Sequence, residues 1–153
     1  MKKLNRFSFG ATSSITTSLS LIVGFATTTH QKMGVISALA VLAVADNISD
    51  SLGIHIYRES EDAGQPNWYT VTNFLTRLVL TCIFAAIVLL VPEPYMLPIA
   101  IVFGMAVLSL LSYLIAIDQG INPYVELPKH LAIATIAMVA SYFVGRLIRF
   151  YLA

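Results

Sequence analysis

The sequence predicts an all-α integral membrane protein with five transmembrane helices, and three observations carry this prediction. The 153 residues are 58% hydrophobic and only 11% charged, whereas charged residues make up about 25% of an ordinary soluble domain. Five apolar stretches are each long enough to cross a bilayer, which takes about 20 residues of helix. Short polar or proline-bearing segments separate these stretches. The chain, residues 1–153, is therefore expected to form a single transmembrane domain.

The five predicted spans follow one another with short connections. They lie at about 9–29, 33–57, 68–91, 96–118 and 129–150. The segment HQKM joins the first pair, and the proline-bearing segment PEP joins the third and fourth spans. Gly120 and an Asn-Pro pair mark the connection before the fifth span. The charged linker RESEDAGQPN, between the second and third spans, is too short to fold on its own.

The distribution of basic residues predicts a cytoplasmic N-terminus. In that orientation five basic residues face the cytoplasm (Lys2, Lys3, Arg6, Arg58 and Lys129) and three face the opposite side (Lys32, Arg146 and Arg149). An odd number of spans then places the C-terminus on the side opposite the cytoplasm. The net charge of +1 gives no reason to expect nucleic-acid binding. The single cysteine, Cys82, excludes an intramolecular disulfide.

The second span carries two carboxylates inside an apolar helix. Asp46 and Asp50 are four residues apart, so a helix presents them on one face, together with Ser49. A carboxylate at the centre of a bilayer costs at least about 2.5 kcal/mol, and two on one face cost more. A cation, a basic side chain or protons must therefore compensate for them.

Arg77, inside the third span, is the expected compensating side chain. With a rise of about 1.5 Å per residue, Asp46 lies about 16 Å from Tyr57 at one helix end, and Arg77 lies about 15 Å from Asn67. These depths match, so we expect Arg77 to pair with Asp46 or with Asp50 one turn away. The simplest arrangement pairs Arg77 with Asp46 and leaves Asp50 to handle an ion.

The first span carries a stripe of small and hydroxyl-bearing residues at helical spacing. Its members are Ser13, Thr16, Thr17, Ser20 and Gly24. Small residues let helix backbones approach closely, so the stripe is consistent with tight packing. It is equally consistent with the lining of a hydrated ion path, because hydroxyls supply weak oxygen contacts.

The remaining polar residues of the spans have plainer interpretations. Asp118, at the end of the fourth span, is either a solvated helix terminus or a residue that guards the mouth of a path. We expect Ser109 and Ser112 to be packing residues and His130 to be an ordinary interfacial residue. No nucleophile–base constellation or cofactor loop is visible, so neither an enzyme nor a permanently bound cofactor is expected.

Three groups of residues carry a resemblance to a known family. The groups are Gly10, Thr17 and Gly24 in the first span, Ala45, Ile48, Ser49 and Gly53 in the second, and Gly-Arg-Leu-Ile from Gly145 in the fifth. The first two groups match positions of the family patterns G-x-x-D-G-x-x-T, followed by an apolar stretch and a Gly, and A-x-x-I-S-M-x-x-G-E-Y. The Gly-Arg-Leu-Ile of the fifth span also fits, and the chain resembles the vacuolar iron transporter (VIT) family. The resemblance implies a homodimer with its metal path at the interface, formed largely by the first helix. It also implies export of a divalent metal from the cytosol in exchange for protons.

The sequence departs from the family pattern at the positions that matter most. The first-helix Asp of the family falls on Ser13, and its second-helix Met falls on Asp50. In the family these two positions belong to the intramembrane metal path. The long cytoplasmic metal-binding helices that the family carries between spans two and three are missing, and only Glu59, Glu61 and Asp62 remain there as acidic residues.

These observations favour a transporter of Fe²⁺ or Mn²⁺ with an oxygen-rich site. The candidate ligands are Asp46, Asn47, Ser49, Asp50, Ser13 and Thr17, with Arg77 as ion-pair partner and Asp118 as a possible gate. Hard oxygen ligands without Cys or Met suit such ions, and a carboxylate pair is suited to carry the counter-proton. The alternative is a non-transporting membrane scaffold in which Asp46, Asp50 and Arg77 are structural. A third interpretation is transport of a solute other than a metal, because Arg77 neutralises one carboxylate.

Overall fold

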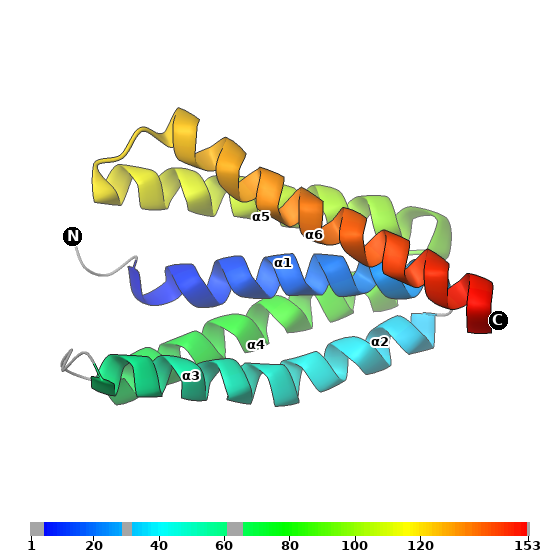
Figure 1. Ribbon diagram of the computed structural model, residues 1–153, viewed down its shortest axis with the longest axis horizontal. Helices are drawn as coiled ribbons and strands as arrows, with labels where there is room; N and C mark the ends of the chain where they lie inside the picture. The colour runs from blue at the N-terminus through cyan, green and yellow to red at the C-terminus, as the bar shows by residue number, and fades with distance from the viewer. Residues whose placement is uncertain (1–4, 29–31, 61–65, 153) are drawn as a thin grey trace.

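The computed structural model describes residues 5–28, 32–60 and 66–152, and all of its regular elements are helices. In chain order they are α1 (Asn5–Thr28), α2 (Lys32–Val41), the π-helical segment η1 (Leu42–Asp46), α3 (Asn47–Ser60), α4 (Pro66–Leu90), α5 (Glu93–Gln119) and α6 (Pro123–Leu152). α1 runs through the middle of the molecule, with α5 and α6 on one side and α4 and the α2–α3 helix on the other (Figure 1). The expected residues Lys2, Lys3, Glu61 and Asp62 lie outside the described residues.

Five of the described helices are long and apolar enough to cross a membrane, with α2, η1 and α3 counted as one continuous helix, Lys32–Ser60. Their outward faces are apolar: the exposed fractions of Val102, Ile136 and Leu110 are 69%, 68% and 60%. A surface of this kind is unfavourable in water, because contiguous apolar patches on soluble monomers are small. The prediction of an all-α chain with five such helices is confirmed.

Two predicted connections were too long. Glu93 and Pro94 belong to the first turn of α5, and only Pro92 stands before it as the N-cap. α6 begins at Pro123, six residues before the predicted start at 129. The Asn122 side chain accepts a hydrogen bond of 3.0 Å from the backbone N–H of Tyr124, and a proline fits the first helical position because its missing donor is not needed there.

Gly120 ends α5 as the sequence suggested. Its φ of 69° lies in the left-handed region, which a glycine adopts without steric cost. Its N–H donates to the carbonyl of Ile117 at 3.1 Å, so a carbonyl at the end of α5 is satisfied. The chain then turns back directly into α6.

The apolar core surrounds α1. Ile15, Leu19 and Ile22 of α1 are fully buried, and they belong to one cluster with Phe84 of α4 and Leu108 of α5. Phe84 also packs edge-to-face against Phe103, with ring centroids 5.6 Å apart. This packing holds α4 and α5 on either side of α1, so polar side chains on α1 and α4 face each other at a fixed distance.

α1 and α6 cross in close contact near their C-terminal ends. A Cβ atom placed on Gly145 would lie 2.4 Å from the carbonyl oxygen of Gly24 and 2.1 Å from the hydroxyl of Thr27. Thr28 also donates a hydrogen bond of 3.4 Å to the carbonyl of Gly145. Toward the other end of the molecule the two helices draw apart (Figure 1). The crossing therefore depends on two small residues, as is common between membrane helices.

Candidate functional site

Arg77 is a buried charge near the middle of α4. It lies eleven residues after Pro66 and thirteen before Leu90, so it is about 16 Å from the start of the helix. Only 2% of the residue is exposed. An arginine cannot deprotonate in a protein, so a guanidinium buried in this way requires acceptors.

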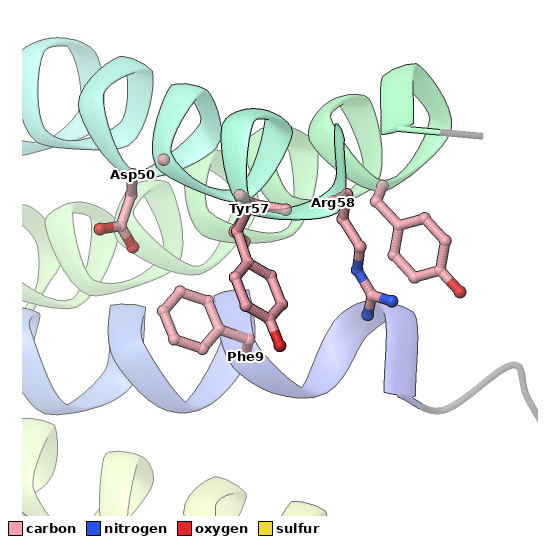
Figure 2. Close-up of a pocket in the computed structure, with 7 residues that line it drawn as sticks. Phe9, Asp50, Tyr57 and Arg58 are labelled. Carbon is pink, nitrogen blue, oxygen red and sulfur yellow. The ribbon is translucent and has the colours of Figure 1, made fainter. Parts of the chain in front are cut away.

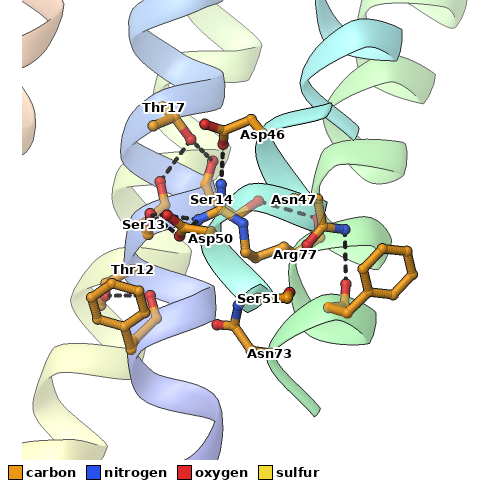
Figure 3. Close-up of polar contacts among 12 residues, drawn as sticks. Thr12, Ser13, Ser14, Thr17, Asp46, Asn47, Asp50, Ser51, Asn73 and Arg77 are labelled. Carbon is orange, nitrogen blue, oxygen red and sulfur yellow. Dashed lines mark hydrogen bonds and ion pairs between the residues drawn. The ribbon is translucent and has the colours of Figure 1, made fainter. Parts of the chain in front are cut away.

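Three side chains from three different elements accept hydrogen bonds from Arg77 (Figure 3). Its Nη2 forms an ion pair with Oδ2 of Asp46 in η1. Its Nη1 donates to Oδ2 of Asp50 in α3 at 2.5 Å and to the hydroxyl of Ser13 in α1 at 2.6 Å. The predicted pairing of Arg77 with Asp46 is confirmed, and we call these four residues the Arg77 cluster.

Asp50 is also paired, so the expectation that it is left without a basic partner was wrong. The two carboxylates lie one helical turn apart, about 5–6 Å, and a guanidinium carries donors on both of its terminal nitrogens. One arginine can therefore reach both carboxylates at once, whereas a lysine offers a single charged atom. Helix depth alone does not determine how many carboxylates a guanidinium reaches, because that number also depends on the width of the group.

The cluster nevertheless keeps an unbalanced charge that is partly accessible. Two carboxylates and one guanidinium leave one formal negative charge in excess. Arg77 uses only the Oδ2 atom of each aspartate, and 43% of the Asp46 side chain and 33% of the Asp50 side chain remain exposed. Within the described ranges no group of three or more His, Cys, Asp or Glu residues is placed to hold a metal ion. A cation here would therefore be held by these two carboxylates and neighbouring hydroxyls.

A π turn immediately before Asn47 sets the direction of both carboxylates. The backbone N–H of Asn47 donates to the carbonyl of Leu42, five residues earlier, and the π segment ends at Asp46. A π turn takes up one more residue than an α turn, so the residues after it are rotated by about 100° relative to a continuous α-helix. Such π turns are frequent at functional sites, and the surrounding sequence showed no sign of this one.

Asn47, predicted as a possible ligand, instead joins two helices. It is 1% exposed, and its side-chain amide donates to the carbonyl of Phe74 in α4 at 3.0 Å. One turn further on, Asn73 of α4 donates to the hydroxyl of Ser51 in α3 at 3.1 Å. These contacts fix the distance between α3 and α4, so that Asp50 meets Arg77.

The other predicted site residues lie apart from the guanidinium. Ser49 is exposed, on a different face of α3 from Asn47. The hydroxyl of Thr17 bonds back to the carbonyl of Ser13 in its own helix, at 2.8 Å. Asp118 lies in the last turn of α5, and no α5 residue takes part in the described contacts of the Arg77 cluster.

A second row of hydroxyls on α1, beside the predicted stripe, faces α4. Ser14 and Ser18 are buried, whereas Ser13, Thr16, Thr17 and Ser20 are half-buried. Ser14 donates to the carbonyl of Arg77 at 3.2 Å and lies 3.2 Å from the hydroxyl of Thr81. The sequence does contain a pattern that predicts this row. Polar residues recur every four positions on both helices, at Ser14 and Ser18 of α1 and at Asn73, Arg77 and Thr81 of α4.

Two grooves run along α1 and meet the cluster from opposite directions. Asp50 lines a groove of about 390 Å³ between α1 and α3, with the rings of Phe9 and Tyr57 between it and Arg58 (Figure 2). Arg58 lies over the ring of Tyr69 at the outer end, 4.1 Å from its centroid. Asp46 lines a second groove of about 570 Å³, formed by α1, α2 and η1. Both carboxylates are therefore reachable from the surface.

His130 of α6 contacts a polar side chain of α5. Its Nδ1 lies 3.0 Å from the hydroxyl of Ser112, which is fully buried. Glu126, one turn earlier in α6, lines the same pocket of about 280 Å³ but pairs with Lys129 at 2.7 Å. This polar contact joins α6 to α5. Ser112 therefore makes a hydrogen bond to the His130 ring in addition to its packing role.

Comparison of the chain with known protein families, with characterised proteins and with solved structures gave no match. The resemblance to the vacuolar iron transporter family therefore stays a prediction from the motifs of the first, second and fifth spans. The function has to be inferred from the geometry of the Arg77 cluster.

Proposed function

We propose that this chain is a multi-pass membrane protein that transports a divalent metal cation, Fe²⁺ or Mn²⁺, through the Arg77 cluster. The observation that carries the proposal is the excess of one carboxylate over the guanidinium at mid-helix depth. Five helices of sufficient length and apolarity support the membrane setting. Transport rather than storage fits a site that two surface grooves reach.

The charge balance distinguishes a cation site from a simple salt bridge. One carboxylate is enough to neutralise Arg77, and the second adds a net negative charge; an uncompensated carboxylate costs at least about 2.5 kcal/mol inside a bilayer. A bound cation or a proton offsets this cost. Carboxylate and hydroxyl oxygens are hard ligands that suit Mn²⁺ and Fe²⁺ better than copper, and Ser13 supplies a hydroxyl 3.4 Å from Asp50 Oδ2.

A homodimer would complete such a site. One cluster carries a single excess negative charge, so two clusters facing each other across a twofold axis would balance one divalent ion. The half-buried hydroxyls of α1 lie on the helix that lines both grooves, and a second copy would cover them. We propose this dimer together with a cytoplasmic N-terminus and proton-coupled export, for which the carboxylates carry the counter-proton.

The three hydrogen bonds of Arg77 favour a second candidate function, that of a membrane scaffold. Because Arg77 reaches both carboxylates and Ser13, the cluster also has the form of a structural ion-pair network. In that case the chain is a non-transporting scaffold, and the network specifies how α1, α3 and α4 pack.

Flux of Mn²⁺ and Fe²⁺ into proteoliposomes tests the proposal. We expect the unmodified chain to move at least one of these ions, and Asp50→Asn to slow it by about tenfold to a hundredfold, since even outer-shell partners of metal ligands cost that much. Asp118→Asn, which removes a carboxylate outside the cluster, is the matched control and should leave the rate unchanged. If the unmodified chain moves neither ion, the proposal of metal transport fails.

A further inference from the structure

A basic pocket of about 380 Å³ lies at the end of the molecule where α6 ends. Its polar and charged lining consists of Thr27, Lys32, Glu93, Tyr142, Arg146 and Arg149, contributed by α1, α2, α5 and α6. We call it the basic pocket. The Arg77 cluster does not use any of these residues.

Positive charge is concentrated in the basic pocket. Six Lys or Arg side chains are described in the structure, and three of them line this one pocket. Glu93 is the single carboxylate in the lining, so two formal positive charges are in excess. Arginines that merely extend from a helix end toward water need not converge with a lysine from another helix. Here Lys32 of α2 and two arginines of α6 share one cavity.

Contacts of the fold hold the Lys32 ammonium and the backbone that carries Arg146. The ammonium of Lys32 donates to the carbonyl of Val91, directly after α4, and, at 3.5 Å, to that of Leu89 in the last turn of α4. An ammonium has three donors, so one remains for a ligand. Arg146 follows Gly145, whose close contact with Gly24 locks this part of α6 onto α1.

The chemistry of the lining selects a phosphate joined to an apolar body. Guanidinium groups recognise phosphate through paired hydrogen bonds, and lysine adds a point charge. Val35, Met96 and Leu97 form an apolar wall of the same pocket. The pocket lies at helix ends, where the headgroups of a bilayer would be. We propose that the basic pocket binds the headgroup phosphate of an anionic phospholipid, an inference that rests on the membrane setting of the proposed function.

Native mass spectrometry of the full chain in detergent, with added phosphatidylglycerol or phosphatidylcholine, tests this inference. We expect one phosphatidylglycerol per chain, bound at least about tenfold more tightly than phosphatidylcholine. Arg146→Gln and Lys32→Gln should each weaken binding about fivefold, as expected for one basic residue near an anionic lipid. Glu93→Gln should tighten binding, because it removes the only carboxylate.

Arg58→Gln is the matched control, because Arg58 lies over Tyr69 at the other end of the molecule. Equal affinity for the two lipids, or equal loss with Arg58→Gln and Arg146→Gln, would overturn the inference. Displacement of the lipid by millimolar inorganic phosphate would also overturn it, in favour of a soluble anion. A third outcome separates the two proposals. If the chain co-floats with lipid vesicles and binds phosphatidylglycerol selectively but does not transport metal, the transport function is rejected and the lipid site stands.

Discussion

α4 and α5 flank the same central helix but contact it with different chemistry. α4 spans Pro66–Leu90 and α5 spans Glu93–Gln119. The buried polar residues of α4 are Thr72, Asn73, Arg77 and Thr81, whereas the buried face of α5 is apolar or small except for Ser112. α5 packs against α1 through apolar and small residues, whereas α4 adds hydrogen bonds and a buried charge to its apolar contacts.

The difference supports the proposal that the Arg77 cluster carries the function. A helix that only supports α1 needs no buried charge, as α5 demonstrates, and replacing a buried ion pair by apolar side chains is often neutral or stabilising. The guanidinium on α4 and the carboxylates on η1 and α3 are therefore costly if their role is packing alone. We interpret α1, α3 and α4 as the functional half and α5 and α6 as the supporting half.

The largest expected effect on stability comes from removing the buried guanidinium. Arg77→Gln leaves Asp46 and Asp50 without their cation, and breaking a buried pair costs about 3–5 kcal/mol. Because both carboxylates are partly exposed, we expect a loss near the lower limit, about 3 kcal/mol. Chemical unfolding in detergent measures it, with Ser112→Ala on α5 as the matched change. An equal loss for the two variants would remove the distinction between the two helices.

The two carboxylates should show a strongly non-additive response. Asp46→Asn or Asp50→Asn alone leaves the cluster neutral and Arg77 still paired, so neither should lower the free energy of unfolding by more than about 1 kcal/mol. The double variant strands Arg77 and should cost about 3 kcal/mol. A double-mutant cycle of unfolding free energies measures the coupling, and additive single effects would show that only one aspartate pairs with Arg77.

The supporting half should respond to volume rather than charge. Gly145→Ala places a methyl group against the Gly24 carbonyl, and we expect a cost of about 1–3 kcal/mol for the forced separation of α1 and α6. Gly53→Ala is the matched control, because nothing lies within 4 Å of its added Cβ. That change should stabilise α3 by up to about 1 kcal/mol. Thermal unfolding of both variants decides whether close packing holds α6.

The smallest expected effect on the free energy of unfolding distinguishes two neighbouring polar residues of α3. Asn47→Ala removes the hydrogen bond to the Phe74 carbonyl, at a cost of about 0.5–1.5 kcal/mol. Ser49→Ala changes an exposed side chain and should stay within about 0.5 kcal/mol. Comparable losses in the unfolding free energies of the two variants would place Ser49 in a contact that the structure does not show.

Periodicity and helix depth were sufficient to predict the five helices and the meeting of Arg77 with Asp46. Both depend on local properties: apolar length, breaker residues and the constant rise per residue. The π turn at Leu42–Asp46 and the pairing of Asp50 depend on how η1 and α3 pack against α4, which no local pattern encodes. The contact of His130 with Ser112 likewise joins two helices, and the early start of α6 follows from capping by Asn122.

The most direct test of whether the Arg77 cluster binds a divalent cation is whether the metal stabilises the folded chain. The unfolding temperature of the purified chain should be measured with increasing Mn²⁺, with Mg²⁺ and sodium at matched ionic strength as controls. A cation that binds only the folded chain stabilises it by about 2.7 kcal/mol at a hundred times its dissociation constant. We predict a saturable rise for the unmodified chain that Asp50→Asn abolishes and Asp118→Asn retains. A flat response of the unmodified chain, or an equal rise in Asp50→Asn, would contradict a cation site in the cluster.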